Sequence, residues 1–151
     1  MQIILTLALL TPLVFLVPRR FKVWFTLALV GAGAALALGA AGRVLAGSEF
    51  ASGEALQWRF HTLFGPQYAT LDTISAIFVI IICIGALAVT LYSRGYIAAV
   101  GGDKPGPHIS LHYMCLGLLF FSMLGVVTSH GGYSFLIFWE LMTISSFALI
   151  L

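Results

Sequence analysis

Long runs of apolar residues make up most of this chain, and polar residues interrupt them at only a few places. At a rise of about 1.5 Å per residue, each run is long enough for a helix to cross the hydrocarbon core of a bilayer. The first run lies near the lower limit of that length, and we expect Pro12 to kink it. The pattern predicts five transmembrane helices, at about 1–17, 23–45, 71–92, 111–129 and 133–151.

The longest polar connection, residues 46–70, has a different pattern. Apolar and polar residues alternate from 56 to 60, and Gly65 and Pro66 then supply a turn. Alternation with a period of two is typical of a strand that is apolar on one face. We therefore expect a short hairpin near 55–70, lying on the extracytoplasmic membrane surface, within a fold that is otherwise all-α.

The composition is typical of a polytopic membrane protein. Of the 151 residues, 61% are hydrophobic and 8% are charged, whereas soluble domains carry about 25% charged residues. We expect one membrane domain, a transmembrane helix bundle within the lipid bilayer, and no basic patch indicates nucleic acid binding. A secretory signal would carry its cations before the first apolar run, but here they follow it, so residues 1–17 should remain as a helix.

Cations lie mainly in two of the connections. Arg19, Arg20 and Lys22 lie between the first two predicted helices, and Arg94 and Lys104 lie between the third and the fourth. The positive-inside rule places these connections in the cytoplasm, with the N-terminus and the hairpin outside. The predicted location is the cytoplasmic membrane of a bacterium or an archaeon.

Small residues mark positions where helices can approach closely. Gly31, Ala35 and Gly39 recur at a spacing of four in the second predicted helix, a pattern that favours close helix packing. Gly117 and Gly125 are further close-packing positions in the fourth helix.

Cysteines and histidines do not form a predicted metal site. Cys83 and Cys115 lie alone in separate apolar runs, where isolated thiols are usually packing residues. His61 is expected to be a solvated surface residue. His108 and His112 are four residues apart, but Pro107 and the loop before it leave only His112 clearly helical, and no third ligand is evident. We expect no metal and no cofactor.

Glu140 is the single ionisable residue in the 17 residues from Phe135 to Leu151. A carboxylate at this depth costs roughly 2.5–3.5 kcal/mol, so it should face a protein interior or water, and it is a functional candidate. Thr143 and Phe147 share its helix face at i+3 and i+7. The alternative is a structural role, in which Glu140 only hydrogen-bonds a neighbouring helix.

Three other polar residues could support proton transfer. Asp72 stands at the start of the third helix, where it either caps the helix or takes part in an ion path. His130 lies in a tight turn with Gly131 and Gly132 and is a candidate for proton entry. His112, in the fourth helix, completes the candidate set.

Three segments together resemble the N-terminal part of the antiporter-like membrane subunits found in respiratory complex I, in Mrp sodium/proton antiporters, and in group 4 hydrogenases and formate hydrogenlyase. Phe-Trp-Glu-Leu-Met is the most specific piece, and its surroundings are most similar to hydrogenase-4 component B or the large Mrp subunit. The segments are Leu71-Asp-Thr-Ile-Ser-Ala-Ile-Phe78, Leu91-Tyr-Ser-Arg-Gly-Tyr-Ile97 and Phe138-Trp-Glu-Leu-Met-Thr-Ile-Ser-Ser-Phe147.

The resemblance implies a fold of roughly fourteen transmembrane helices built from inverted repeats. It also implies that Glu140 pairs with a lysine on a later helix, and that proton transfer continues through further lysines and histidines. No lysine lies within the five predicted helices. We therefore expect the chain to be a truncated or split N-terminal part, which other membrane subunits and the missing helices complete.

The sequence leaves three interpretations open. The first is a subunit that translocates protons or sodium ions, uses Glu140 as a switch and carries no redox chemistry of its own. The second is a non-catalytic membrane scaffold. The third is a small oligomeric channel or transporter in which several copies of Glu140 line a pore.

Overall fold

The computed structural model describes residues 2–47, 58–62, 65–100 and 106–150. Five α-helices, one 3-10 helix and a two-stranded sheet occupy these ranges. In chain order they are α1 (Gln2–Leu10), the 3-10 helix η1 (Thr11–Phe15), α2 (Lys22–Leu45), β1 (Trp58–Thr62), β2 (Gly65–Ala69), α3 (Thr73–Val100), α4 (Gly106–Thr128) and α5 (Gly132–Ile150).

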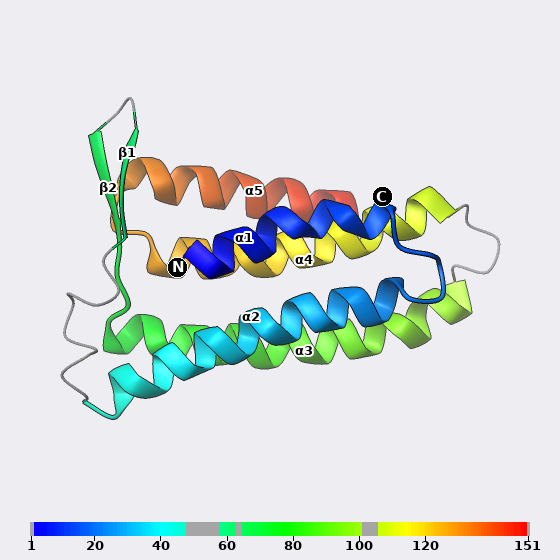
Figure 1. Ribbon diagram of the computed structural model, residues 1–151, viewed down its shortest axis with the longest axis horizontal. Coiled ribbons are helices and arrows are strands. Elements are labelled where there is room, and N and C mark those ends of the chain that lie inside the picture. The colour runs from blue at the N-terminus through cyan, green and yellow to red at the C-terminus, as the bar shows by residue number, and fades with distance from the viewer. Residues whose placement is uncertain (1, 48–57, 63–64, 101–105, 151) are drawn as a thin grey trace.

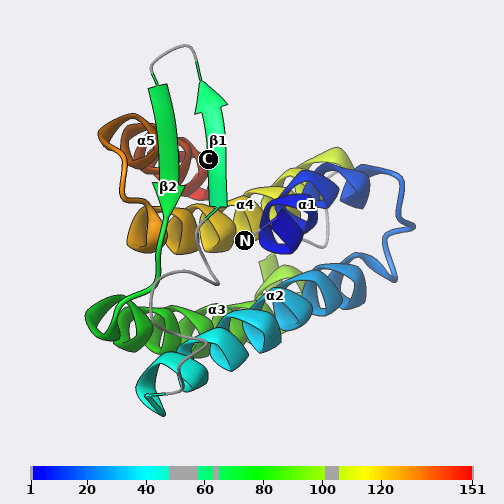
Figure 2. The ribbon, with the colours of Figure 1, turned by 60° about the vertical axis from the view of Figure 1, so that its left-hand side comes forward.

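The helices run lengthwise in two packed pairs (Figure 1). α2 lies along α3 and α4 lies along α5, while contacts of α4 with α2 and α3 join the pairs. α1 and η1 pack on α4 and also contact α2. Turning the molecule shows the β1–β2 hairpin beside the turn between α4 and α5 (Figure 2). We call this the hairpin end, and the opposite end, where α2 and α4 begin, the basic end.

Four of the helices, α2 to α5, are long and apolar enough to cross a membrane. The segment predicted as a first span is not confirmed as one, because its helical residues, Gln2–Leu10 of α1 and Thr11–Phe15 of η1, are too few to cross a bilayer. The α-helix ends at Leu10 and continues as a 3-10 turn that contains Pro12. Proline has no backbone N–H and clashes with the carbonyl four residues earlier, so the α-helical ladder stops there.

α3 and α4 extend beyond their predicted limits at the basic end. α3 continues through Arg94 to Val100, and α4 already begins at Gly106. Pro107 lies in the first turn of α4, where the missing N–H has no intrahelical partner to lose. His108 is therefore helical, and the prediction that only His112 would be helical is wrong.

The predicted hairpin is present, but Gly65 and Pro66 do not form its turn, because both lie in β2, opposite Thr62 and His61. β1 and β2 pair antiparallel, from Trp58 opposite Ala69 to Thr62 opposite Gly65. Its base is joined to the bundle by a bridge between Ala69 and Ser129, and the backbone N–H of Thr70 donates to the carbonyl of Thr128 at 3.0 Å. Residues 55–57 and 63–64 of the predicted hairpin lie outside the described residues, and its place on a membrane surface stays a prediction.

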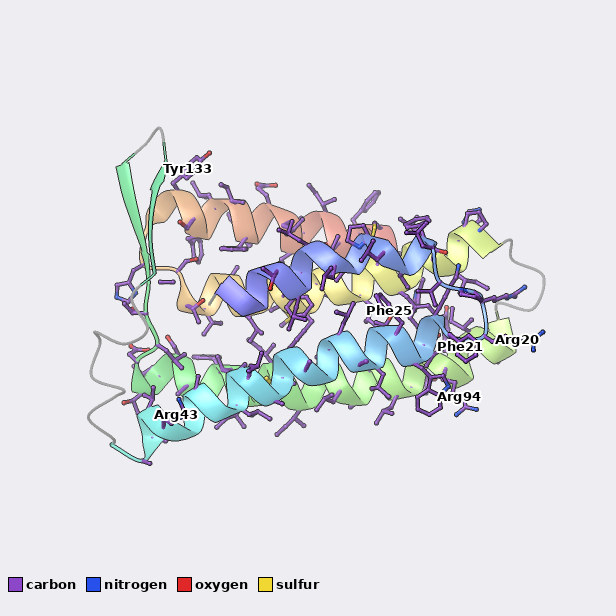
Figure 3. All side chains as sticks on the ribbon, viewed as in Figure 1. Arg20, Phe21, Phe25, Arg43, Arg94 and Tyr133 are labelled. Carbon is purple, nitrogen blue, oxygen red and sulfur yellow. The ribbon has the colours of Figure 1, made fainter. Side chains whose placement is uncertain are left out.

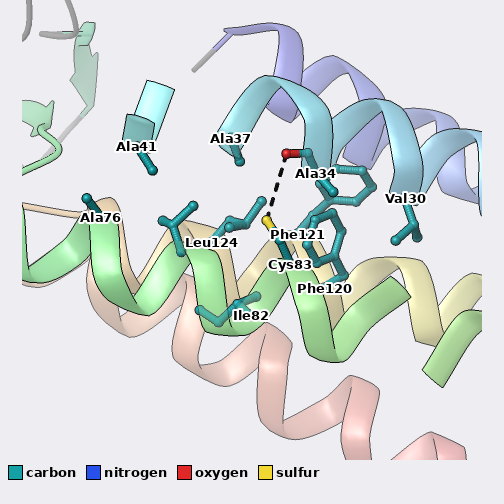
Figure 4. Close-up of a cluster of buried hydrophobic side chains, with 11 residues drawn as sticks. Val30, Ala34, Ala37, Ala41, Ala76, Ile82, Cys83, Phe120, Phe121 and Leu124 are labelled. Carbon is teal, nitrogen blue, oxygen red and sulfur yellow. Dashed lines mark hydrogen bonds between the residues drawn. The ribbon is translucent and has the colours of Figure 1, made fainter. Parts of the chain in front are cut away.

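The main core lies between α2, α3 and α4 (Figure 4). Gly33 of α2 lies so close to α4 that a Cβ atom added there would be 2.7 Å from the ring of Phe121. The buried face of α2 consists mainly of small residues, which bring the helix close to its neighbours. This face comprises Lys22, Thr26, Leu29, Val30, Gly33, Ala34, Ala37 and Ala41.

The predicted packing face of α2 is therefore wrong. Nothing lies within 4 Å of a Cβ added at Gly31 or Gly39, and Ala35 is exposed. Small residues occupy both sides of α2, so their spacing alone did not identify the packed side. The described residues leave the Gly31 side of the helix uncovered.

The other packing predictions are confirmed. An added Cβ at Gly117 would be 2.8 Å from Cγ2 of Thr11, and one at Gly125 would overlap the ring of Phe138. Cys83 and Cys115 are buried and free. The thiol of Cys83 lies 3.9 Å from the carbonyl oxygen of Ala34, as Figure 4 shows.

Candidate ion-translocation site

α5 holds Glu140 near the middle of a membrane-length helix. Glu140 is the eighth residue after Gly132, so it lies roughly 12 Å along the helix axis. The helix is fixed against α4 through the Phe138 ring, which lies on Gly125, and through the buried residues Ser134 and Ser145. These contacts turn one face of α5 toward α4, so the opposite face points outward.

The Glu140 side chain lies on that outward face. Thr143 and Phe147, predicted to share its face, are exposed as well. The Thr143 hydroxyl donates to the carbonyl of Trp139 at 3.0 Å, so its proton is not available to the carboxylate. The sequence predicts that Glu140 faces a protein interior or water, but no described helix covers it, because α5 packs mainly on α4 alone.

Asp72 caps α3, which confirms the simpler of its two predicted roles. Oδ1 of Asp72 accepts a hydrogen bond from the backbone N–H of Ser75 at 2.8 Å. Hydrogen bonding by the Ser75 hydroxyl and backbone, with a contribution from the charge of His130, lowers the pKa of Asp72 below its ordinary 3.8. The backbone bond is the persistent one, since the single Ser75 hydroxyl proton also bonds the carbonyl of Val127 at 3.0 Å.

The structure brings His130 to the same place. Nδ1 of His130 lies 2.5 Å from the hydroxyl of Thr70, which links the α4–α5 turn to the residue just before Asp72. Two of the predicted supporting residues, 58 positions apart in the sequence, thus meet at the hairpin end. Eight residues of α5 separate this group from Glu140, so a proton passing between them needs intermediate carriers.

His112 lies at the opposite, basic end. Its ring is half-buried, stacked on Tyr96 with centroids 6.3 Å apart and edge-on to Tyr113 at 5.4 Å. Asp72 and His130 are therefore at one end of the bundle and His112 at the other, and the described residues place none of these three in a common site with Glu140.

One polar residue in the bundle was missed by the sequence analysis. Lys22 is the first residue of α2, is only 5% exposed, and its ammonium donates to the hydroxyl of Ser110, which is 1% exposed. The sequence analysis assigned Lys22 to a loop, one residue before the second predicted helix. Its spacing from Thr26 and Val30, which share the buried face of α2, is the signal that identifies it.

Comparison with known proteins identifies relatives but no matching family model. The antiporter subunit mnhA2 of Staphylococcus saprophyticus is 38% identical over 80 residues, which is 53% of this chain and 9% of that protein. The mnhA2 subunit of Staphylococcus aureus has the same identity and coverage. NAD(P)H-quinone oxidoreductase chain 5 of Picosynechococcus is 34% identical over 136 residues, which is 87% of this chain and 19% of that protein.

This chain spans less than a fifth of the length of these relatives. They represent the Mrp and complex I branches of the predicted resemblance, whereas the likeness to hydrogenase-4 stays a prediction. Their similarity agrees with the apolar helices of the structure, which support an integral membrane protein. The chain is a relative of the antiporter-like membrane subunits of Mrp antiporters and of complex I-type quinone oxidoreductases.

Proposed function

We propose that this chain is part of a membrane subunit that translocates protons or sodium ions in a respiratory or hydrogenase-type complex, with Glu140 as its protonatable switch. The observation that carries the proposal is the position of Glu140, the one acidic side chain within the described membrane-length helices. The names of the relatives, an antiporter subunit and a quinone oxidoreductase chain, support the reaction class.

The proposed switch follows from the cost of charge in hydrocarbon. A carboxylate in the middle of α5 is tolerated when it is protonated or when a cation pairs with it. A lysine ammonium placed against Glu140 would hold it ionised, and withdrawal of that ammonium would leave proton uptake as the way to remove the charge. Movement of one partner would thus drive binding and release of a proton.

The partner belongs, in this proposal, to helices that cover the outward face of α5. The apolar residues around Glu140 suit such a covering helix: Trp139, Ile144 and Phe147 are exposed on α5. The covering helices would come from a longer form of this subunit or from a neighbouring one. We do not expect the 151 residues alone to pump ions. Glu140 is half of the proposed ion pair, and without a cationic partner and further proton carriers among the described residues it provides no path across a membrane.

The test is Glu140→Gln in the assembled complex. The substitution keeps the shape and removes the titratable group, so we expect proton pumping to be lost while the complex still assembles. Ser146→Ala on the same helix, which removes a hydroxyl bonded to the carbonyl of Thr143 at 2.9 Å, is the control and should retain pumping. Wild-type pumping by the Glu140→Gln complex would favour the scaffold interpretation instead.

The exposure of Glu140 also supports a second candidate, the small oligomeric channel. If several copies of this chain met through their α5 faces, their Glu140 side chains would line a shared pore. Purified wild-type chain reconstituted in liposomes would then conduct ions, and Glu140→Gln would abolish the current. If liposomes that contain the wild-type chain conduct no ions, the channel candidate is excluded and the proposed role as a subunit of a larger complex remains.

A further inference from the structure

Exposed aromatic and cationic side chains meet at the basic end, on the outer side of the α2–α3 pair. The guanidinium carbon of Arg94, near the end of α3, lies 5.7 Å from the centroid of the Trp24 ring on α2. Trp24 is 56% exposed and the neighbouring Phe21 is 59% exposed. Figure 3 places Arg20, Phe21 and Arg94 together at this end, far from Arg43 at the other. We call Arg20, Phe21, Trp24 and Arg94 the Arg94 surface.

The depth of this surface follows from the helix limits. The membrane-length part of α2 begins at Lys22, and that of α3 ends at Ile97. Trp24 and Arg94 are therefore both within one turn of a span end, on helices that pack side by side. Tryptophan is enriched where the hydrocarbon meets the lipid headgroups, and an arginine near a helix end extends its side chain to the same level, so the Arg94 surface lies at headgroup level.

Among the described residues, no hydrogen bond or ion pair occupies the guanidinium of Arg94. Stacking on Trp24 uses the flat face of the group, whereas the N–H bonds point outward in its plane. The described carboxylates do not compete for them, because Asp72 is at the hairpin end and Glu140 is in the middle of α5. Lys22, by contrast, is turned inward to Ser110.

We propose that the Arg94 surface binds the phosphate headgroup of an anionic phospholipid. The planar fork of Arg94 matches two oxygens of one phosphate, and Arg20 adds a second positive charge at the same end. The exposed rings of Phe21 and Trp24 provide apolar contact for the glycerol and upper acyl chain. These flanking rings favour a lipid over a free phosphate ion. The inference does not depend on the proposed function.

Native mass spectrometry of the full chain in detergent tests the proposal, with phosphatidylglycerol or phosphatidylcholine added in equal amounts. We expect wild type to retain phosphatidylglycerol preferentially. Arg94→Gln should weaken that retention by about fivefold, the effect of one interfacial arginine, and adding Arg20→Gln should weaken it further. Arg43→Gln, the same change on an exposed arginine at the other end of α2, is the matched control and should leave retention unchanged.

The Arg94→Lys variant distinguishes the effect of the guanidinium shape on lipid binding from the effect of the positive charge alone. Lysine keeps the positive charge but loses the fork and the stacking, so we expect retention between wild type and Arg94→Gln. Equal retention by Arg94→Gln and Arg43→Gln would overturn the site. Displacement of the lipid by inorganic phosphate at millimolar concentration would overturn the choice of a lipid ligand. Helicity by circular dichroism confirms that each variant is folded.

Discussion

At the scale of single residues, the closest contact between α4 and α5 is made by Phe138, whose ring occupies the space where residue 125 would carry a side chain. The contacted ring atoms lie near the root of the side chain, so the ring cannot move aside cheaply. We predict that Gly125→Ala destabilises the folded chain by about 1–3 kcal/mol through overpacking. Unfolding in denaturing detergent, followed by circular dichroism, measures this.

Gly39→Ala is the matched control for that substitution, because nothing lies within 4 Å of its added Cβ. The same methyl group in the open part of a helix should stabilise the chain by about 0.4–1 kcal/mol, since glycine is the more flexible residue when unfolded. Equal effects of the two substitutions would contradict the close packing of α4 on α5.

The Asp72 cap predicts a dependence of stability on pH. The pKa of Asp72 is lowered in the folded chain, so its contribution to stability is present above the ordinary value of 3.8 and is lost as the pH falls through the folded value. Asp72→Asn keeps a good capping residue without the ionisation. We expect its stability to fall less than that of wild type on acidification, as thermal unfolding between neutral and acidic pH can measure.

The role of a residue could be predicted from the sequence where it depends only on neighbours a few positions away in the chain. Asp72 was identifiable because a capping bond reaches only three residues along the chain. The burial of Lys22 was not, because it depends on where α2 begins and on Ser110 across the bundle. Because α2 begins one residue earlier than predicted, Lys22 is a buried helical residue and not the loop residue that was expected.

At the scale of elements, Pro12 sets the shape of the N-terminal segment. We predict that Pro12→Ala lets α1 continue as an α-helix through Phe15, because it restores a backbone donor and removes the ring clash. Hydrogen exchange at residues 12–15 should slow and helicity should rise. A control substitution, Leu13→Ala, changes an exposed side chain in the same turn and should leave exchange as it is.

The elements themselves were predictable where hydrophobic length or alternation was strong. The four long helices and the hairpin follow from those patterns. The side of α2 that is packed did not follow from the sequence, because glycine and alanine lie on both sides of the helix. Its Gly33 side is selected by contacts with α3 and with the rings of Phe120 and Phe121 on α4.

At the scale of the whole molecule, the outward face of α5 distinguishes the chain alone from the assembled complex. We predict that a cysteine at Thr143, which is exposed, reacts with a membrane-permeant maleimide in the isolated chain but is protected in the complex. A cysteine at Ser145, which is buried, should be protected in both. Equal labelling of Thr143→Cys in both preparations would contradict the proposal that other helices cover this face.

The candidate site could be predicted only in part, because part of it would come from helices outside the described residues. The apolar run around Glu140 reveals its depth in α5, and the motif resemblance indicates its family. The group that would complete the site has no counterpart among the described residues near α5, so no local pattern in these residues can specify it.

The junction of the hairpin with the α4–α5 turn has a mechanical consequence. The Ala69–Ser129 bridge and the bond from Thr70 to Thr128 fasten the hairpin to the end of α4, just before the turn into α5. Because Phe138 on Gly125 and the buried Ser145 also hold α5 against α4, a displacement of Glu140 relative to α4 would have to break those contacts, whereas a movement of α4 and α5 together would keep them.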